Sequence, residues 1–396
     1  MNDPDRSISD IKQNIISQID AMAPELIDLA KTLYDHPETA YQEHNACQWL
    51  SEFLRKHGFA VETAIGGVQT AFSARHSEKQ VDKPSVAFLA EYDALPKIGH
   101  GCGHNLIAAA SIGAFIALHR AWPKPPGAVQ LIGTPAEEGG GGKARLAEAG
   151  VFEGVDFSLM FHPGHANRMG SNSLGRIKAQ VEFFGQTAHA ATAPEKGINA
   201  LDAMIGAYNN ISFLRQQMPA IGRIHGVITS GGDAPNIIPD YAAGLFYIRS
   251  LERDYLNVLF KRFEECCKGA AQASGCSVKI TVLPPSLEPM KRNLFMESVW
   301  QANMASVGEE PCLTDGPNGS TDLGNISHIM PVIQPYLALC SEDIAAHTVE
   351  FADATQSPTG KAVLINAAKL LAMTAADYLD SETIREAAAR EFANAQ

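Results

Sequence analysis

The sequence predicts an α/β protein with two domains, a larger one built on a mostly parallel sheet and a smaller ferredoxin-like one inserted into it. Apolar runs at 85–90 and 129–133 are continuous rather than alternating, which is typical of strands covered on both faces. The segment from 179 to 283 has a different order of elements. With 396 residues, the chain is also longer than one ordinary hydrophobic core requires.

The larger domain begins with a predicted helix. Apolar residues recur at helical spacing over residues 11–33. Buried strands are then predicted at 85–90, 129–133 and 157–161, and a helix at 106–120 lies between the first two. This alternation of buried strands and helices indicates a mostly parallel sheet with helices on its faces.

The middle of the chain predicts a β-α-β-β-α-β order, which is the split βαβ arrangement of a ferredoxin-like module. The predicted elements are a strand at 179–184, a helix at 198–218, strands at 223–229 and 241–249, a helix at 255–273 and a strand at 277–283. We therefore assign residues 177–288 to an inserted domain, and residues 1–176 and 289–396 to the larger domain.

Composition excludes several classes of protein. The net charge of −13 argues against a nucleic-acid partner, because binding a phosphate backbone needs a basic face. We see no run of about 20 apolar residues to span a membrane and no basic segment leading into an apolar one at the start, so we expect no membrane partner and no secretory signal. The odd count of seven cysteines, without a CxxC pair, is typical of reduced thiols and predicts a cytoplasmic location.

Polar side chains follow each of three predicted strands. Asp93 comes after the strand at 85–90, Glu137 and Glu138 follow the second strand, and His162 follows the third. Because sites in open α/β sheets form beyond the carboxyl ends of the strands, these residues are expected to converge at one edge. Histidines and carboxylates at one place indicate a metal site.

The segment 100–105, HGCGHN, adds a cysteine and a histidine just before a predicted helix. Its glycines allow a tight turn, so Cys102 and His104 can reach one point. Cysteine and histidine are ligands that suit zinc and similar metals. The alternative is a buried structural cysteine.

Glu137 and Glu138 are adjacent, and adjacent residues on an extended chain point in opposite directions. One carboxylate can then bind metal while the other acts on the substrate water. The alternative is a solvated acidic turn.

These motifs resemble the aminoacylase and carboxypeptidase G family of two-metal hydrolases. The resemblance is to its branch of indoleacetyl-amino-acid hydrolases, aminobenzoyl-glutamate hydrolases and related dipeptidases. It spans roughly residues 15 to 375 and keeps the family's order of motifs. The matching segments are EYDALP (91–96), HGCGHN (100–105), PAEEGGGG (135–142), FHPG (161–164), GQTAHA (185–190), APNIIPD (234–240) and GSTD (319–322), followed by His347.

The resemblance implies a metal-dependent amidohydrolase that cleaves a small N-acyl amino acid or dipeptide. It implies two divalent metal ions, zinc or manganese, and a general base, Glu137, supported from behind the metal site by Asp93. The implied metal ligands are Cys102, His104, Glu138, His162 and His347.

The inserted domain is implied to act as a lid and to form a homodimer. His189 matches a histidine that reaches the neighbouring subunit's site and steadies the oxyanion. Asn236 and Arg249 match positions that contact the carboxylate end of the substrate, and Ser320 and Thr321 are expected to line the pocket.

One position departs from the peptidase branches, which carry a metal-binding histidine where this chain has Glu91. Three other functions stay open. The first is an aryl-amide or aminobenzoyl-glutamate hydrolase, and the second is a cysteine hydrolase using Cys102 with His104. The third is a non-catalytic metal-binding relative.

Overall fold

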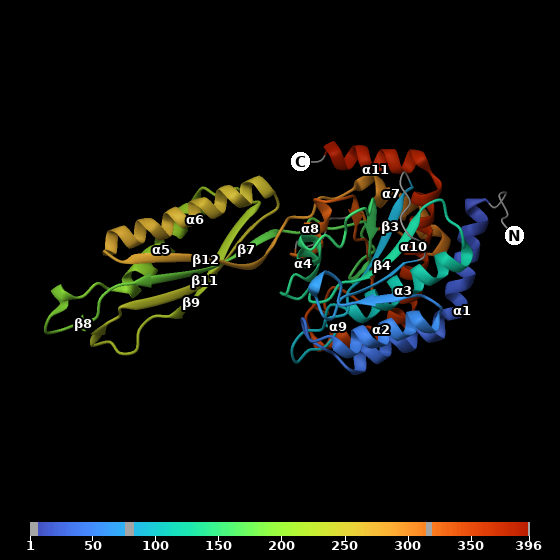
Figure 1. The fold of residues 1–396 in the computed structure, drawn as a ribbon. Coiled ribbons are helices and arrows are strands. Elements are labelled where there is room, and N and C mark those ends of the chain that lie inside the picture. The colour runs from blue at the N-terminus through green and yellow to red at the C-terminus, as the bar shows by residue number, and fades with distance from the viewer. Residues whose placement is uncertain (1–6, 76–82, 314–318, 395–396) are drawn as a thin grey trace. The chain divides into compact units, whose positions relative to one another are not determined.

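The computed structural model describes residues 7–75, 83–313 and 319–394, which form two compact units (Figure 1). Unit 1 consists of Met1–Asn172, Lys291–Asn318 and Asn325–Gln396, and unit 2 of Ser173–Met290 and Gly319–Gly324. The insertion was expected at 177–288, whereas the main segment of unit 2 starts at Ser173 and ends at Met290 and a short later segment adds to it.

Unit 1 contains a mixed sheet that is mostly parallel, as predicted. In the described part of unit 1 the strand order is β1-β2-β4-β3-β5-β13, and the four strands β4, β3, β5 and β13 run parallel. Every residue of β3 and β4 is buried, which explains their continuous apolar runs. The bounds are β1 (Val61–Thr63), β2 (Phe72–Arg75), β3 (Ser85–Ala90), β4 (Ala128–Gly133), β5 (Phe157–Leu159) and β13 (Val332–Ile333).

Three long helices, α1 (Ile8–Asp35), α3 (His104–Ala121) and α10 (Pro358–Asp380), pack against one another, and α3 also packs on β3 and β4. A capping box starts α1, because the Ser7 hydroxyl accepts the Asp10 N–H at 3.2 Å and the Asp10 carboxylate accepts the Ser7 N–H at 3.3 Å. Since α3 is covered by two helices and the sheet, it is buried on nearly every side.

The helix α10 is long and apolar enough to cross a membrane, by length and composition alone. This segment was not identified from the sequence as an apolar run of that kind. However, 72% of its most apolar window is buried inside the protein, where it packs against α1 and α3. Core packing therefore accounts for its apolar composition.

Shorter elements complete unit 1. The parallel pair of β6 and β14 lies two residues beyond β5 and β13, respectively, along the chain. The bounds are α2 (His44–Lys56), α4 (Gly142–Glu148), β6 (His162–Gly164), α7 (Leu294–Met304), β14 (Tyr336–Ala338), α9 (Val349–Ala354) and α11 (Glu382–Asn394), while α8 (Leu323–Ser327) begins in the last residues of unit 2.

Unit 2 is an antiparallel sheet with two helices on one face (Figure 1). The sheet order is β12-β7-β11-β9. Alternate residues of β7 from Ile177 to Phe183 are buried in one core with α5 and α6. The residues of β7 between them therefore lie on the opposite face of the sheet. The bounds are β7 (Gly175–Phe184), α5 (Ala200–Gln216), β9 (Gly222–Ser230), β11 (Tyr241–Ser250), α6 (Arg253–Ser274) and β12 (Ser277–Leu287).

Two short strands add to this order. β8 (Ala188–His189) pairs antiparallel with β10 (Ile237–Ile238), and the two motifs GQTAHA and APNIIPD meet there. His189 lies directly opposite Ile237 in this pair.

Candidate metal centre

The carboxyl ends of the parallel strands β3 and β4 supply the first polar groups of unit 1's candidate site. Asp93, three residues beyond β3, is fully buried, and Glu137 and Glu138 follow β4. His162 opens β6, beyond the end of β5. Because β3 pairs in parallel register with both β4 and β5, these ends meet at one edge of the sheet.

The HGCGHN loop reaches the same edge because of Gly103. This residue has φ +73°, and a Cβ on it would lie 2.4 Å from Pro163 Cγ. A glycine is therefore needed for the close approach of the loop to the FHPG segment. The approach brings the rings of His104 and His162 to a centroid separation of 6.0 Å, nearly perpendicular to each other.

Asp93 organises the cluster from behind. Its Oδ1 lies 3.0 Å from His104 Nδ1, and its Oδ2 accepts the backbone N–H of Glu138 at 2.8 Å. Because Nδ1 faces oxygens, the lone pair of the neutral ring is on Nε2, which is the nitrogen available to a metal. Burial opposes the charge of Asp93, but His104, the Glu138 N–H and Lys143 together outweigh it and lower the pKa of this carboxyl.

His162 is arranged in the same way. Its Nδ1 lies 2.7 Å from the carbonyl oxygen of Pro163, which leaves Nε2 as the free nitrogen. Burial lowers the pKa of His162 to about 4, so the ring is neutral near pH 7. Tyr336 of β14 packs beside it, with ring centroids 5.3 Å apart.

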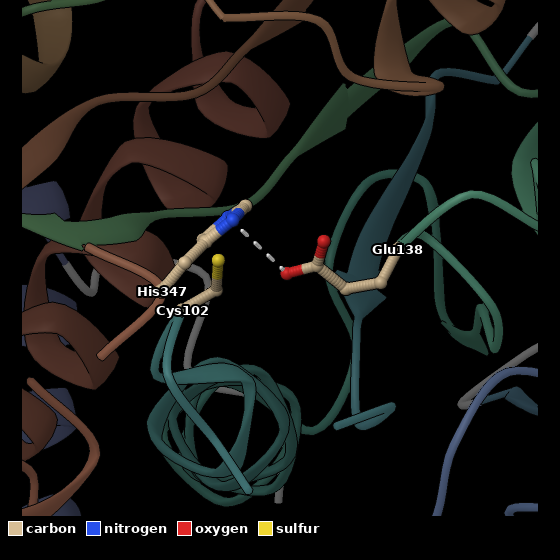
Figure 2. Close-up of side chains that lie close together, drawn as sticks. All are labelled: Cys102, Glu138 and His347. Carbon is tan, nitrogen blue, oxygen red and sulfur yellow. Dashed lines mark ion pairs between the residues drawn. The ribbon is translucent and has the colours of Figure 1, made fainter. Parts of the chain in front are cut away.

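Cys102, Glu138 and His347 form one metal-ligand group, in which their ligand atoms all lie within 4.8 Å of one another (Figure 2). His347 Nε2 is 3.7 Å from Glu138 Oε1. His347 has φ +65°, a conformation that is uncommon for a non-glycine residue, and its N–H donates to Gly101 O at 3.0 Å. The backbone therefore fixes His347 against the HGCGHN loop.

A second group contains His104, Glu137 and Glu138, with ligand atoms again within 4.8 Å of one another. The expectation that the adjacent glutamates lie on extended chain and point apart is wrong. They lie in a turn, which follows Ala136 with φ +61° and is closed by the Gly139 N–H donating to Glu137 O at 2.6 Å. The turn lets both carboxylates approach His104.

The unsatisfied atoms of this region fit a divalent cation. Among the described residues, His104 Nε2, Glu138 Oε1 and Glu91 Oε2 are buried and have no hydrogen-bond partner. Burial alone would lower the pKa of His104, but Asp93 and the neighbouring glutamates raise it well above its usual value. Orphaned nitrogen and oxygen atoms together with a thiol form a donor set that fits a divalent metal ion.

The same surroundings do not suit a cysteine nucleophile. Burial raises the pKa of Cys102 well above its ordinary value, and the neighbouring Glu138 carboxylate raises it further. A nucleophilic cysteine needs the opposite environment, in which positive charge stabilises the thiolate. The cysteine hydrolase is therefore not supported by this geometry.

Two buried residues near the site were missed in the sequence. Lys143, fully buried on α4, forms a short ion pair with Glu91, whose other oxygen is 3.5 Å from His104 Nε2. Glu43, also fully buried, accepts the Ala136 N–H at 2.9 Å and so supports the turn before Glu137. A lysine after the glycine run was a visible signal for the first, but nothing in the sequence pattern identified the second.

The remaining predicted residues belong to unit 2. His189 is exposed on β8, and its Nδ1 accepts the N–H groups of Ala191 and Thr192 at 3.2 Å. Asn236 is exposed, and its backbone carbonyl accepts the Ala190 N–H at 3.0 Å.

Arg249 of β11 donates to Ser320 Oγ at 2.9 Å. Thr321 Oγ1 accepts the Leu323 N–H at 3.2 Å. The GSTD loop and the end of β11 are thus joined within unit 2.

Known proteins resemble this chain over most of its length. Residues 87–370 match the family described as peptidase family M20/M25/M40. The Xaa-Arg dipeptidase of Mus musculus is 38% identical over 397 residues, covering 96% of this chain and 92% of the mouse protein. One of the subunits of the p-aminobenzoyl-glutamate hydrolase of Escherichia coli K12 is 33% identical over 294 residues, covering 69% and 60%. The crystal structure of a dinuclear metal-binding peptidase from Bacillus subtilis has the same fold, with a TM-score of 0.69, 20% identity and coverage of 91% and 99%.

Proposed function

The chain belongs to peptidase family M20/M25/M40, and from this premise we propose that it cleaves a small N-acyl amino acid or dipeptide with Glu137 as the general base. The family resemblance found in the motifs is confirmed. The protein is a metal-dependent hydrolase of peptide or amide bonds. The single observation that carries the proposal about Glu137 is the group it forms with His104 and Glu138.

We assign two divalent ions, zinc or manganese, to the centre. The B. subtilis structure is of a dinuclear metal-binding peptidase, and this chain has two overlapping groups of ligand atoms that share Glu138. When bound, such ions would polarise the scissile carbonyl and lower the pKa of the attacking water. The proposed ligands are Cys102, His104, Glu138, His162 and His347.

The chain's own groups have distinct proposed roles. Glu137 accepts a proton from the attacking water and passes it to the leaving amine. Asp93 fixes the orientation of His104 through Nδ1 and holds the Glu138 backbone, so both stay in one geometry. A carboxylate beside the ligands, held by a turn, is suited to proton transfer because it can reach the water without moving the metal ligands.

We assign unit 2 the role of a ferredoxin-like lid and dimerisation domain. Support comes from its β-α-β-β-α-β order and from β9, an edge strand with Val227 and Ile228 exposed. In a cytoplasmic homodimer, His189 of one protomer would stabilise the oxyanion in the site of the other. Light scattering during size-exclusion chromatography tests the dimer, and a monomer at working concentration would contradict it.

The substrate is proposed to be a dipeptide or N-acyl amino acid, because the dipeptidase relative matches 96% of the chain. An aryl amide such as aminobenzoyl-glutamate is the second candidate, favoured by the E. coli relative over 69% of the chain. Asn236, Arg249, Ser320 and Thr321 are the proposed substrate contacts. An amine-release assay with dipeptides, N-acetyl amino acids and aminobenzoyl-glutamate, with manganese or zinc supplied, separates the two candidates.

The general base is tested with Glu137→Gln. We expect kcat to fall by about 10² to 10⁴ while the bound metal content stays at the wild-type value. Glu148→Gln is the matched control, because Glu148 is exposed on α4, eleven residues after Glu137. Turnover retained in Glu137→Gln would refute the assignment, and a wild-type protein that binds metal but releases no amine from any substrate would indicate a non-catalytic relative.

A further inference from the structure

The face of the unit 2 sheet that the helices leave uncovered carries an unusual pair of arginines. Arg176 of β7 and Arg249 of β11 are directly opposite each other in the antiparallel register. Side chains at directly opposite positions lie on the same face and close together. Two like charges at such a pair are destabilising unless another group compensates them.

Neither guanidinium has a carboxylate partner among the described residues. Arg249 donates to Ser320 Oγ, and no hydrogen bond or ion pair of Arg176 is found in the described part of the chain. The Nε atoms of both arginines are buried and unpaired there. This is unexpected in a chain with 44 acidic and 31 basic residues, since acidic partners are plentiful elsewhere.

The two side chains are nevertheless held in place. Both guanidinium groups lie against the ring of Tyr247, at 5.1 Å for Arg176 and 5.5 Å for Arg249. Burial and the charge of Arg176 both lower the pKa of Arg249, which shows that the two charges oppose each other. The fold thus orders two mutually repelling cations on an aromatic surface, without supplying the anion that would compensate them.

We propose that Arg176 and Arg249 together form one carboxylate-binding site, and that its ligand is a carboxylate on the amine half of the substrate. The motif match assigns such a contact to Arg249 alone, so Arg176 is the new binding residue. Guanidinium groups bind carboxylates through paired N–H donors, and in the described part of the chain no hydrogen bond or ion pair occupies the donors of Arg176. This inference rests on the proposed amide hydrolysis and specifies which amides are accepted.

The test compares a dipeptide that has a free carboxylate with the same dipeptide as its C-terminal carboxamide. Arg176→Gln should lower kcat/KM for the acid about 10-fold to 100-fold, mostly through KM, and leave the carboxamide unchanged. Arg176→Lys keeps the charge but loses the planar fork, so an intermediate loss is expected. The matched control is Lys178→Gln, two residues along the same strand and on the same face. This variant should change kcat/KM for neither substrate by more than about twofold.

A second measurement does not depend on turnover. Isothermal titration of N-acetyl-alanine, N-acetyl-glutamate and N-acetyl-alaninamide into metal-loaded protein should show weaker binding of both acids in Arg176→Gln, with the amide unaffected. If N-acetyl-glutamate alone loses affinity, the side-chain carboxylate is the ligand, and if both acids lose equally, it is the α-carboxylate.

The outcomes separate this inference from the proposed function. Equal losses for acid and carboxamide, or no loss at all, overturn the role of Arg176. A misfolded variant would lose activity on both substrates and the far-ultraviolet circular dichroism signal. In that case the acid and carboxamide activities of Arg176→Lys decide the role of Arg176. If wild-type protein cleaves neither substrate, the proposed function fails, and the titration alone decides whether the arginine pair binds carboxylates.

Discussion

Replacing Lys143 should lower the stability of unit 1 strongly. Its side chain is fully buried on α4, and its ammonium forms a short ion pair with Glu91, which is 1% exposed. Lys143→Met keeps nearly the same volume, so little cavity is created. The variant leaves a carboxylate in the interior without its ammonium partner.

The expected cost follows from this burial. Breaking a buried ion pair by removing one partner costs about 3–5 kcal/mol, because the remaining Glu91 carboxylate stays out of water with His104, 3.5 Å away, as its remaining cationic neighbour. For a unit of this size, that loss corresponds to a fall in Tm of roughly 6 to 20 °C. The double variant Glu91→Gln with Lys143→Met removes both charges and should recover most of the loss.

Tryptophan fluorescence gives a unit-specific assay. The chain has three tryptophans, Trp49, Trp122 and Trp300, and all of them belong to unit 1. Urea unfolding should be followed in a chelating buffer, since bound metal would add stability of its own. Lys361→Met, at an exposed position of α10, is the matched control and should stay within about 0.5 kcal/mol of wild type. A Lys143→Met protein within about 1 kcal/mol of wild type, or a double variant no more stable than the single one, would refute the reasoning.

Three further predictions concern the candidate site. Asp93→Asn should weaken metal affinity about 10-fold to 100-fold in chelator competition, because His104 loses the carboxylate that orients it; unchanged affinity would contradict this. Burial raises the pKa of Glu43 to about 7 from its ordinary value of 4.5, so the stability due to this group is present below pH 4.5 and is lost as the pH rises through 7. The free energy of unfolding of Glu43→Gln, measured in urea between pH 4.5 and 8, should lack that loss. If the variant and wild type show the same pH dependence, Glu43 is not its source. Manganese or zinc should raise the Tm of the tryptophan signal, and Cys102→Ser should reduce the rise; an equal rise in both proteins would argue against Cys102 as a ligand.

The arrangement of unit 1 could be predicted because it depends on local patterns. Continuous apolar runs identified β3 and β4, and parallel neighbours necessarily end at the same edge. The position of Asp93 beside the HGCGHN loop follows from that topology. The motifs alone were sufficient to place Cys102 and His104 in the same region.

Other features depend on backbone conformation or on pairing over long distances, which residue patterns do not encode. The turn at Glu137 and Glu138 arises from a positive φ at Ala136, and alanine gives no sequence signal for that conformation. Lys143 and Glu91 are 52 positions apart in the chain, and only the fold brings them together. The opposition of Arg176 and Arg249 likewise depends on the exact register of β7 and β11.

The interrupted path of the chain has a consequence for synthesis on the ribosome. Unit 2 is almost one continuous segment of the chain. The first and last residues of that segment are joined, because the Met290 N–H donates to Ser173 O at 3.3 Å. Unit 1, in contrast, lacks α10 until the last 40 or so residues have been translated, and α10 packs against α1 and α3. The nascent protein can therefore complete the middle of its sequence before the domain that contains its first residue. During that interval the apolar surfaces of α1 and α3 that pack against α10 in the folded protein have no partner helix to cover them.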